Sequence, residues 1–310
     1  MNKFFTIPGL GANGHAYLFL TMTTLCWGGN AVFSRLAVGE VSPLTLVTLR
    51  WATVLVLLLI FARKDVARDW PVLKPRLGYF IAMGSIGFTG FNALFYIAAH
   101  TTTAVNIGII QGAIPIFVLI GTFVFFKSPV TFRQIIGVIL TLIGVVVVTS
   151  GGSFEKLIDL AINQGDFLLL IACMLYAGYT VALRFKPDVA ALSFFSILAI
   201  AAFATCIPLL AYEIYSGAAM APTPKGWMLI GAIALLPSFL AQIFFIYGVG
   251  LIGPGRAGIF VNLVPIFASL MAVAFLGEPF EIFHGLALLL VLGGIWIAER
   301  GKKQPGDKAA

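Results

Sequence analysis

The chain has 310 residues, of which 60% are hydrophobic and only 10% are charged. With a mean hydropathy of +1.05, it cannot be a water-soluble globular protein, because such proteins carry about 25% charged residues. The formal net charge of +7 does not indicate nucleic-acid binding, since Lys and Arg collect in the cytoplasmic loops of membrane proteins. Continuously apolar runs such as 54–61 and 286–298 exclude a transmembrane β-barrel, whose strands alternate polar and apolar residues.

Apolar runs bounded by charges, Pro or Gly predict an all-α membrane protein with ten transmembrane helices, since about 20 apolar residues span the hydrocarbon core. Most of the 19 Lys and Arg residues fall on the side that holds the N-terminus, whereas Arg35, Lys156 and Lys225 fall on the other side. The positive-inside rule therefore places both termini in the cytoplasm. We expect no removable signal peptide. The predicted helices are 15–36, 43–62, 77–99, 103–125, 131–149, 166–185, 190–213, 226–250, 254–276 and 282–299.

The chain contains an internal repeat. A shift of 150 positions superposes the third to fifth predicted helices on the eighth to tenth and aligns Pro115 with Pro265. A shift of 149 aligns Trp27 in the first predicted helix with Tyr176 in the sixth. Each repeat holds an odd number of helices, so the second must enter the membrane in the opposite direction, and a substrate site is expected near the midplane between the halves. The repeats are assigned to residues 1–150 and 151–310.

Several segments carry a family resemblance. They are TLCWGGNAVFSR (24–35), SPLTLVTLRW (42–51), NALFYIAAHTTTAVNIGIIQGAIPIFV (92–118) and VNLVPIFASLMAVAFLGEPF (261–280). In these segments the chain resembles the EamA-type proteins of the drug/metabolite transporter superfamily, and among them the aromatic amino-acid exporters. The first half departs from the family pattern at Lys127 and Ser128, where Gly-Glu is usual. The resemblance implies a ten-helix, basket-shaped exporter of small metabolites in the bacterial cytoplasmic (inner) membrane.

Polar and aromatic side chains inside the predicted helices are the candidate substrate-binding residues. An unpaired polar group is costly in hydrocarbon, so these side chains should face the bundle interior or a water-filled cavity. Asn92 and Gln242 are amides at equivalent positions of the two repeats. Rings at mid-span depth favour a pocket that stacks flat substrates and attracts an ammonium group. The alternatives are interhelical hydrogen bonds, worth about 0.6 kcal/mol each, and core packing. The candidates are Trp27, Asn30, Asn92, Tyr96, Gln111, Tyr176, Tyr179, Gln242, Tyr247 and Asn262.

Three residues are candidate hinges: Gly112, Pro115 and Pro265. A proline inside a helix removes a backbone hydrogen bond and kinks the helix. The carbonyl groups freed in this way would bind substrate or allow the helix to bend. The alternative is that the small residues of these helices form close-packing surfaces.

Arg50 is the one charged residue well inside a predicted helix. It follows Pro43 by seven residues, about 10 Å of helical rise, so its guanidinium would reach the membrane interface by snorkelling. Structural pairing with backbone carbonyl groups is the favoured interpretation. Binding of a substrate carboxylate is the alternative.

These features favour an exporter of amino acids, aromatic or other neutral ones, that works by alternating access. All 12 acidic residues fall in loops or at helix ends, so no intramembrane carboxylate is available for proton antiport, and facilitated export is favoured with the coupling ion left open. No nucleotide-binding motif is present, the three cysteines have no metal-ligand spacing, and neither a cofactor nor a metal is expected. We expect a monomer whose partners are a small-molecule substrate and the lipid bilayer.

Three alternative functions remain. A multidrug or organic-cation efflux transporter fits the aromatic residues but lacks the intramembrane carboxylate. A membrane-embedded enzyme would need a buried nucleophile, a carboxylate pair or a metal cluster, and the sequence offers no catalytic residue of this kind. A channel lacks rings of charged residues as a selectivity device.

Overall fold

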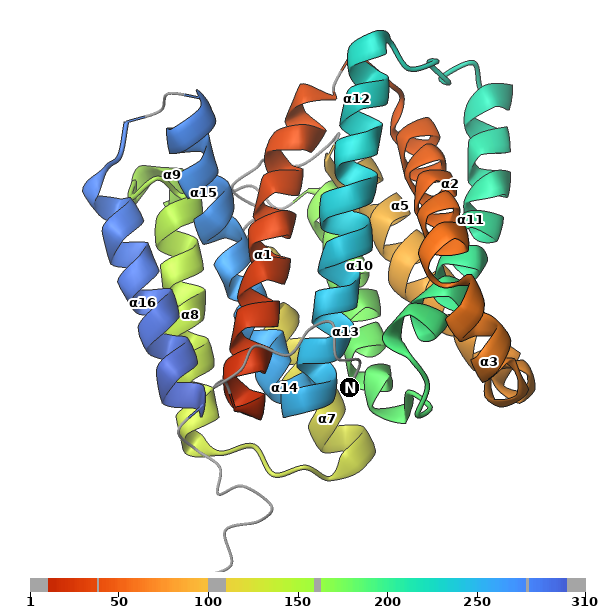
Figure 1. Ribbon diagram of the computed structural model, residues 1–310. Coiled ribbons are helices and arrows are strands. Elements are labelled where there is room, and N and C mark those ends of the chain that lie inside the picture. Colours follow the sequence, from red (N-terminus) through yellow and green to blue (C-terminus); the bar gives the residue numbers. More distant parts are fainter. Residues whose placement is uncertain (1–10, 38, 100–109, 159–162, 277–278, 300–310) are drawn as a thin grey trace, which may run out of the picture.

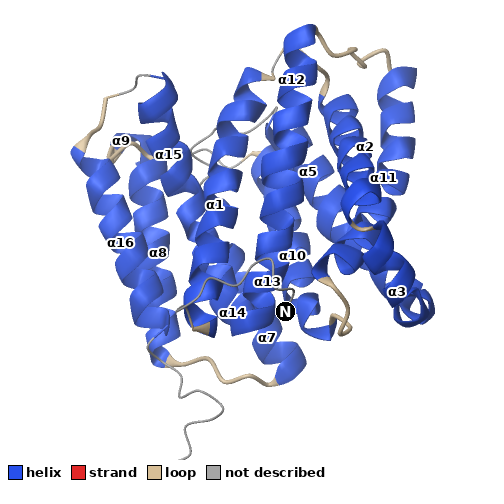
Figure 2. Ribbon diagram, viewed as in Figure 1, coloured by secondary structure: helices blue, strands red, loops and turns tan. Residues whose placement is uncertain are grey.

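The computed structural model describes residues 11–37, 39–99, 110–158, 163–276 and 279–299. Within these residues the chain forms helices and connecting loops, with no β-strand (Figures 1 and 2). The α-helices are α1 (Ala12–Leu36), α2 (Pro43–Phe61), α3 (Arg63–Leu73), α4 (Leu77–Gly84), α5 (Phe91–Ala99), α7 (Ile114–Phe126), α8 (Phe132–Thr149), α9 (Glu155–Ile158), α10 (Gln164–Ala182), α11 (Ala191–Tyr215), α12 (Pro224–Ile233), α13 (Ala241–Ile252), α14 (Pro254–Ala257), α15 (Leu263–Leu276) and α16 (Ile282–Glu299). Two π-helical segments, η3 (Ser85–Gly90) and η5 (Ala234–Leu240), join α4 to α5 and α12 to α13. Three short 3-10 helices are η2 (Lys74–Arg76), η4 (Leu183–Phe185) and η6 (Gly258–Asn262).

The observed helices agree with most of the predicted segments. Predicted helix 254–276 is divided into α14, η6 and α15, and the short helix α9 forms in a stretch predicted as a loop. Predicted helix 103–125 begins among residues 100–109, which lie outside the described residues, and α7 covers the rest from Ile114. The stretch after α2, predicted as a loop, forms the amphipathic helix α3, whose charged side chains are mostly exposed.

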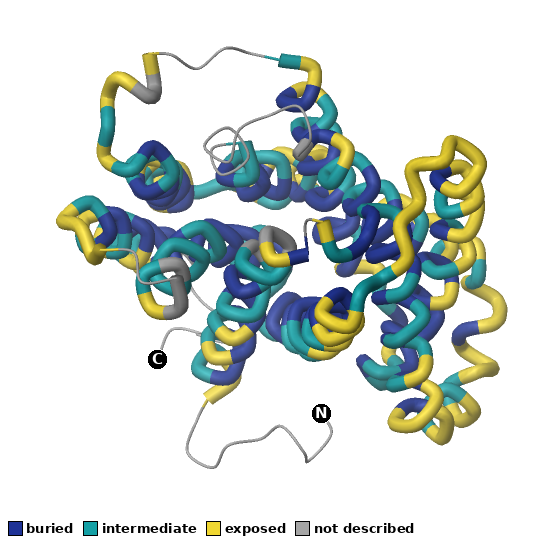
Figure 3. Tube along the Cα trace, turned by 90° about the horizontal axis from the view of Figure 1, so that it is seen from above, coloured by how far each residue is buried: buried dark blue, intermediate teal, exposed yellow. Residues whose placement is uncertain are grey.

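Seven of the described helical segments are long and apolar enough to cross a membrane, and α7 and α16 are shorter apolar helices. The chain is therefore a multi-pass membrane protein. The start of α1 and the end of α16 lie at the same end of the bundle (Figure 1), as an even number of crossings requires. The count of ten and the cytoplasmic location of the termini remain predictions. Viewed from above, exposed residues concentrate along the outer edge of the bundle (Figure 3).

The N-terminus of α2 is capped by a carboxylate from another helix. Glu213, in the last turn of α11 and only 5% exposed, accepts hydrogen bonds from the backbone N–H groups of Leu44 and Thr45, both at 2.9 Å. The hydroxyl groups of Ser42 and Thr45 donate to the same carboxylate at 2.8 and 3.0 Å. Helix starts leave N–H groups without intrahelical partners and carry partial positive charge. The start of α2 therefore compensates the negative charge of this buried carboxylate.

The N-terminus of α11 also contacts a carboxylate from another helix. The backbone N–H of Ala190, which immediately precedes α11, donates to Asp69 of α3 at 3.0 Å. Arg68 holds the same carboxylate through its Nε at 2.9 Å. Helices α2 and α11 pack side by side and occupy corresponding places in the two repeats. The start of α2 contacts a carboxylate from the last turn of α11, and the start of α11 contacts a carboxylate from α3, the helix that follows α2.

Helices α8 and α16, the last of each repeat, pack closely against each other. A Cβ atom on Gly137 would come within 2.5 Å of the Gly294 carbonyl oxygen, and one on Gly294 within 2.6 Å of the Gly137 carbonyl oxygen. A Cβ atom on Gly144 would likewise lie 3.0 Å from the Ala287 carbonyl oxygen. A shift of 150 positions turns Gly137 into Ala287 and Gly144 into Gly294, so this contact is self-complementary. Small residues that let backbones approach are the usual basis of helix association in membranes.

The α8–α16 contact generates a stability prediction. Gly294→Ala should lower stability by about 1–3 kcal/mol, because the added methyl group meets backbone atoms that cannot rotate away. Gly293→Ala is the matched control, since a Cβ on Gly293 meets nothing within 4 Å. Thermal unfolding of both purified variants in detergent measures the difference, and equal melting temperatures would contradict the proposed packing.

The cap on α2 generates a second prediction. Glu213→Gln removes the charge and places an amide N–H₂ against N–H and hydroxyl donors, which should cost about 1–3 kcal/mol. Glu155→Gln, on an exposed side chain, serves as the control. In a thermal-unfolding series the Glu213→Gln variant should melt below both the wild type and the control. Unchanged melting would show that the cap contributes nothing to stability.

Candidate substrate-binding site

The two π-helical segments occupy equivalent positions in the two repeats. At their centres, a shift of 150 positions aligns Gly87 with Pro237. Pro237 has no N–H to donate, and the Ser238 hydroxyl donates instead to the carbonyl oxygen of Ile233 at 2.6 Å. At Gly87 the missing side chain admits Tyr179, whose Cβ would lie 2.6 Å from a Cβ atom there. π-Helical turns occur frequently at functional sites, and here they lie in both halves of the bundle.

Trp27 joins the two halves. Its indole Nε1 donates to the carbonyl oxygen of Pro237 at 3.1 Å. Its ring meets Tyr176 edge-on, with the centroids 5.7 Å apart, and lies 5.2 Å from the ring of Phe245. Trp27 and Tyr176 are equivalent positions of the repeat, so residues related by the internal symmetry meet at the contact between the halves.

Further rings extend this contact into one group. Tyr176 lies 5.6 Å from Tyr179 and 5.1 Å from Phe91, and Tyr179 lies 5.0 Å from Phe88. Tyr176 and Tyr179 are 5% and 2% exposed, whereas Trp27 and Phe91 are half-buried. We name it the ring cluster; it comprises Trp27, Phe88, Phe91, Tyr176, Tyr179 and Phe245.

Polar groups lie directly against the ring cluster. The Tyr179 hydroxyl donates to Oε1 of Gln242 over a long 3.5 Å, and the buried Tyr176 hydroxyl also lies near Gln242 but makes no hydrogen bond of regular geometry. Asn30, three residues after Trp27 on α1, has a buried Oδ1 without a partner. Buried polar atoms are normally satisfied. Unused donors and acceptors beside aromatic rings are what a polar ligand would engage.

Asn92, the counterpart of Gln242, is bonded to Arg50. Arg50 Nη1 donates to Asn92 Oδ1 at 3.3 Å, and Asn92 Nδ2 donates to the carbonyl oxygen of Phe88 at 2.6 Å. The guanidinium lies 5.4 Å from the ring of Trp51. Arg50 is only 5% exposed, so it does not reach the protein surface, and its hydrogen bond goes to a side chain instead of the backbone carbonyl groups expected from the sequence.

Four other candidates are not members of the ring cluster. Tyr96 packs against both the main core and a smaller apolar group around the α1–α2 loop, α2 and α12, and Phe95 links its ring to Phe91 of the ring cluster. The ring of Tyr247 lies 5.9 Å from that of Phe19. Asn262 donates to the Thr141 hydroxyl at 2.7 Å and so links η6 to α8. Gln111 is half-buried.

The candidate hinges lie where helices change geometry. Gly112 is in the turn before α7, and Pro115 is the second residue of α7. Pro265 is the third residue of α15, directly after η6. In both repeats the proline therefore follows an interruption of the α-helix and lies in the first turn of the next helix, where its missing N–H costs nothing.

Sequence reasoning missed Phe88, Phe91 and Phe245. The chain has 28 phenylalanines, so residue type alone does not single out these three. The available signal was their position in the chain, since Phe88 and Phe91 lie close to Asn92 and Phe245 lies close to Gln242.

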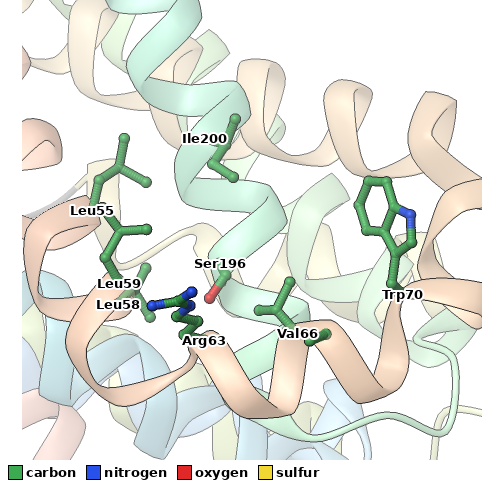
Figure 4. Close-up of a pocket in the computed structure, with 9 residues that line it drawn as sticks. Leu55, Leu58, Leu59, Arg63, Val66, Trp70, Ser196 and Ile200 are labelled. Carbon is green, nitrogen blue, oxygen red and sulfur yellow. The ribbon is translucent and has the colours of Figure 1, made fainter.

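An apolar hollow of about 320 Å³ lies elsewhere, between α2, α3 and α11. Figure 4 shows Arg63, Val66 and Trp70 of α3 facing Ser196 and Ile200 of α11 across it. None of the predicted site residues lines this hollow. Among the described residues, no group of three or more His, Cys, Asp or Glu side chains could hold a metal ion.

Comparison with known proteins identifies the family. The profile of the EamA-like transporter family matches the chain twice, over residues 14–150 and 163–299. The chain is 27% identical over 289 residues to the uncharacterized transporter YyaM of Bacillus subtilis, covering 91% of this chain and 92% of YyaM. It is 25% identical over 296 residues to YetK of the same organism, covering 94% and 88%.

The uncharacterized inner membrane transporter YedA of Escherichia coli is 23% identical over 284 residues, covering 90% of this chain and 88% of YedA. A solved crystal structure that is 17% identical superposes with a TM-score of 0.74 and covers 93% of this chain and 99% of that chain, which shows that the two share a fold. With two family repeats that together span most of its length, the chain belongs to the EamA-like transporter family and is a membrane transporter.

Proposed function

We propose that this transporter exports amino acids, aromatic or other neutral ones, across the bacterial inner membrane. The observation that supports this substrate class is the ring cluster, which joins Trp27 of the first half to Tyr176 and Tyr179 of the second. Rings and amides converge there from both repeats. Aromatic faces stack on flat side chains and attract an ammonium group, while Gln242 and the unpaired Tyr176 hydroxyl offer hydrogen bonds to a zwitterion.

Transport would proceed by alternating access. Tyr176 and Tyr179 of the ring cluster are buried, so a substrate would reach them only after the halves move apart. Trp27 bonds across the halves to the Pro237 carbonyl group, and this contact would open and re-form in each cycle. The interrupted helices before Pro115 and Pro265 lie at matching places in the two repeats, and we assign the bending to them. The driving force is the substrate gradient, and the protein acts as a monomer without a cofactor.

Efflux of drugs or organic cations is the second candidate. The ring cluster favours it, because quaternary ammonium groups bind aromatic faces. The buried positive charge of Arg50 disfavours it, since a second cation nearby would be repelled. The buried carboxylate of Glu213 does not compensate, because four hydrogen bonds commit it to the start of α2.

Counterflow in proteoliposomes tests the function. Vesicles preloaded with unlabelled phenylalanine should accumulate labelled phenylalanine, because exchange on an alternating-access carrier is driven by the outward gradient. Vesicles preloaded with a lipophilic cation should not accumulate the labelled cation. Accumulation of the labelled cation, with no accumulation of labelled tryptophan, phenylalanine or threonine, would indicate a drug-efflux transporter. Dissipation of the label without accumulation would indicate a channel.

Conservative changes in the ring cluster test the site. Tyr179→Phe removes only the hydroxyl that reaches Gln242 and should lower amino-acid exchange about fivefold, the equivalent of one hydrogen bond. Gln242→Ala should lower exchange by at least the same factor. Trp227→Ala is the control, because Trp227 is 54% exposed on α12. Exchange is measured at equal amounts of inserted protein, and wild-type rates in both site variants would refute the assignment.

A further inference from the structure

Arg50 is a buried charge without a counter-charge. It is 5% exposed, and its Nε atom is buried without a hydrogen-bond partner. Among the described residues, the salt bridges are formed by Arg68 and Lys225, and none involves Arg50. Burying an unpaired charge is expensive, and charged residues inside membrane helices pair with other groups or mark the path of a substrate. The cost indicates that an anion completes this site at some stage of the transport cycle.

One edge of the Arg50 guanidinium contacts Asn92. Asn92 accepts from Nη1, and its own Nδ2 is fixed on the Phe88 carbonyl group. The opposite edge of the guanidinium consists of Nε and Nη2, which together donate two parallel hydrogen bonds to a carboxylate in the strongest geometry available to arginine. Nε on that edge is the unpaired atom. Asn92 thus occupies one edge of the guanidinium and leaves the carboxylate-binding edge without a described protein partner at Nε.

The Arg50 site is continuous with the ring cluster. The ring of Trp51 stacks on Phe88 at 4.9 Å, and Phe88 contacts Tyr179. Phe91, next to Asn92 in the chain, contacts Tyr176. A molecule that carries an aromatic group and a carboxylate could therefore engage both parts together.

We propose that Arg50, oriented by Asn92, binds the carboxylate of the transported substrate. This inference rests on the proposed function and narrows it, since it requires a free carboxylate in addition to an aromatic or neutral side chain. Arg50 is a binding residue in this scheme, and Asn92 positions it. The cationic charge that disfavours organic cations is the same charge that selects carboxylates.

The wild-type protein alone gives the first test. In counterflow of labelled phenylalanine, phenylalaninamide should compete at least about tenfold less well than phenylalanine, because the neutral amide forfeits charge-assisted hydrogen bonds. The two competitors share the ring and the amino group and differ only at the carboxyl carbon. Equal competition by the amide would overturn the proposal without any variant.

Variants give the second test. Arg50→Gln should make phenylalaninamide and phenylalanine compete about equally well. Arg50→Lys keeps the charge but loses the two parallel N–H donors, so it should retain part of the preference for phenylalanine. Arg63→Gln, an exposed arginine on α3, should keep the wild-type preference. A purely structural Arg50 would lower exchange for both competitors equally and leave the preference unchanged, and that result would overturn the proposal.

A third measurement separates this inference from the proposed function. Phenylacetate should raise the melting temperature of the purified wild-type protein in chloride-free detergent more than phenylacetamide does, and Arg50→Gln should abolish the difference. If the wild type exchanges no amino acid but shows this shift, the proposed function fails and the carboxylate site stands. An equal shift with chloride in place of phenylacetate would assign the site to inorganic anions and overturn the substrate role.

Discussion

Every backbone N–H and C=O group inside a bilayer needs a partner within the protein, and the structure depends on how that requirement is met where regular helices end or change. At the π turn around Pro237, the carbonyl groups of Ile233 and Pro237 accept hydrogen bonds from the Ser238 hydroxyl and the Trp27 indole. The start of α2 has free N–H groups, and the Glu213 carboxylate satisfies them. The first arrangement builds the contact between the halves, and the second builds the scaffold beside it. The two repeats therefore form hydrogen bonds to each other at places where regular helix geometry ends or changes.

Two inverted repeats with the same sequence would give a symmetric site, and this site is built from their differences. Trp27 and Tyr176 are equivalent, yet the first bonds to Pro237, whereas the second keeps an unpaired hydroxyl. The equivalent amides Asn92 and Gln242 face an arginine in one half and a tyrosine in the other. Symmetry brings these positions together, and asymmetry provides one side with positive charge and the other with aromatic hydroxyl groups. A zwitterion, which has different ends, matches such a site better than a symmetric molecule does.

The sequence predicted the helical segments well because each apolar run is bounded by charges or turn residues. It missed α3, since a short amphipathic helix at the interface has the composition of a loop. Within the site, the repeat identified Trp27, Tyr176 and Gln242, because an internal alignment carries spatial information that residue type does not. It could not foresee that Tyr96 packs against both the main core and the smaller apolar group around α2 and α12, because spacing along one helix carries no information about its neighbours. The phenylalanines of the ring cluster were hidden by the abundance of that residue.

The burial of Arg50 bears on the energetics of transport as well as on selectivity. In this structure its described hydrogen bond goes to a neutral amide, which compensates a positive charge poorly in a medium of low dielectric constant. Binding of a carboxylate would stabilise the closed state more than the open one, where water solvates the guanidinium. A ligand shifts a conformational equilibrium only by its differential affinity for the two states. An uncompensated charge that is buried on closure supplies such a difference, and it would let a loaded carrier close more readily than an empty one.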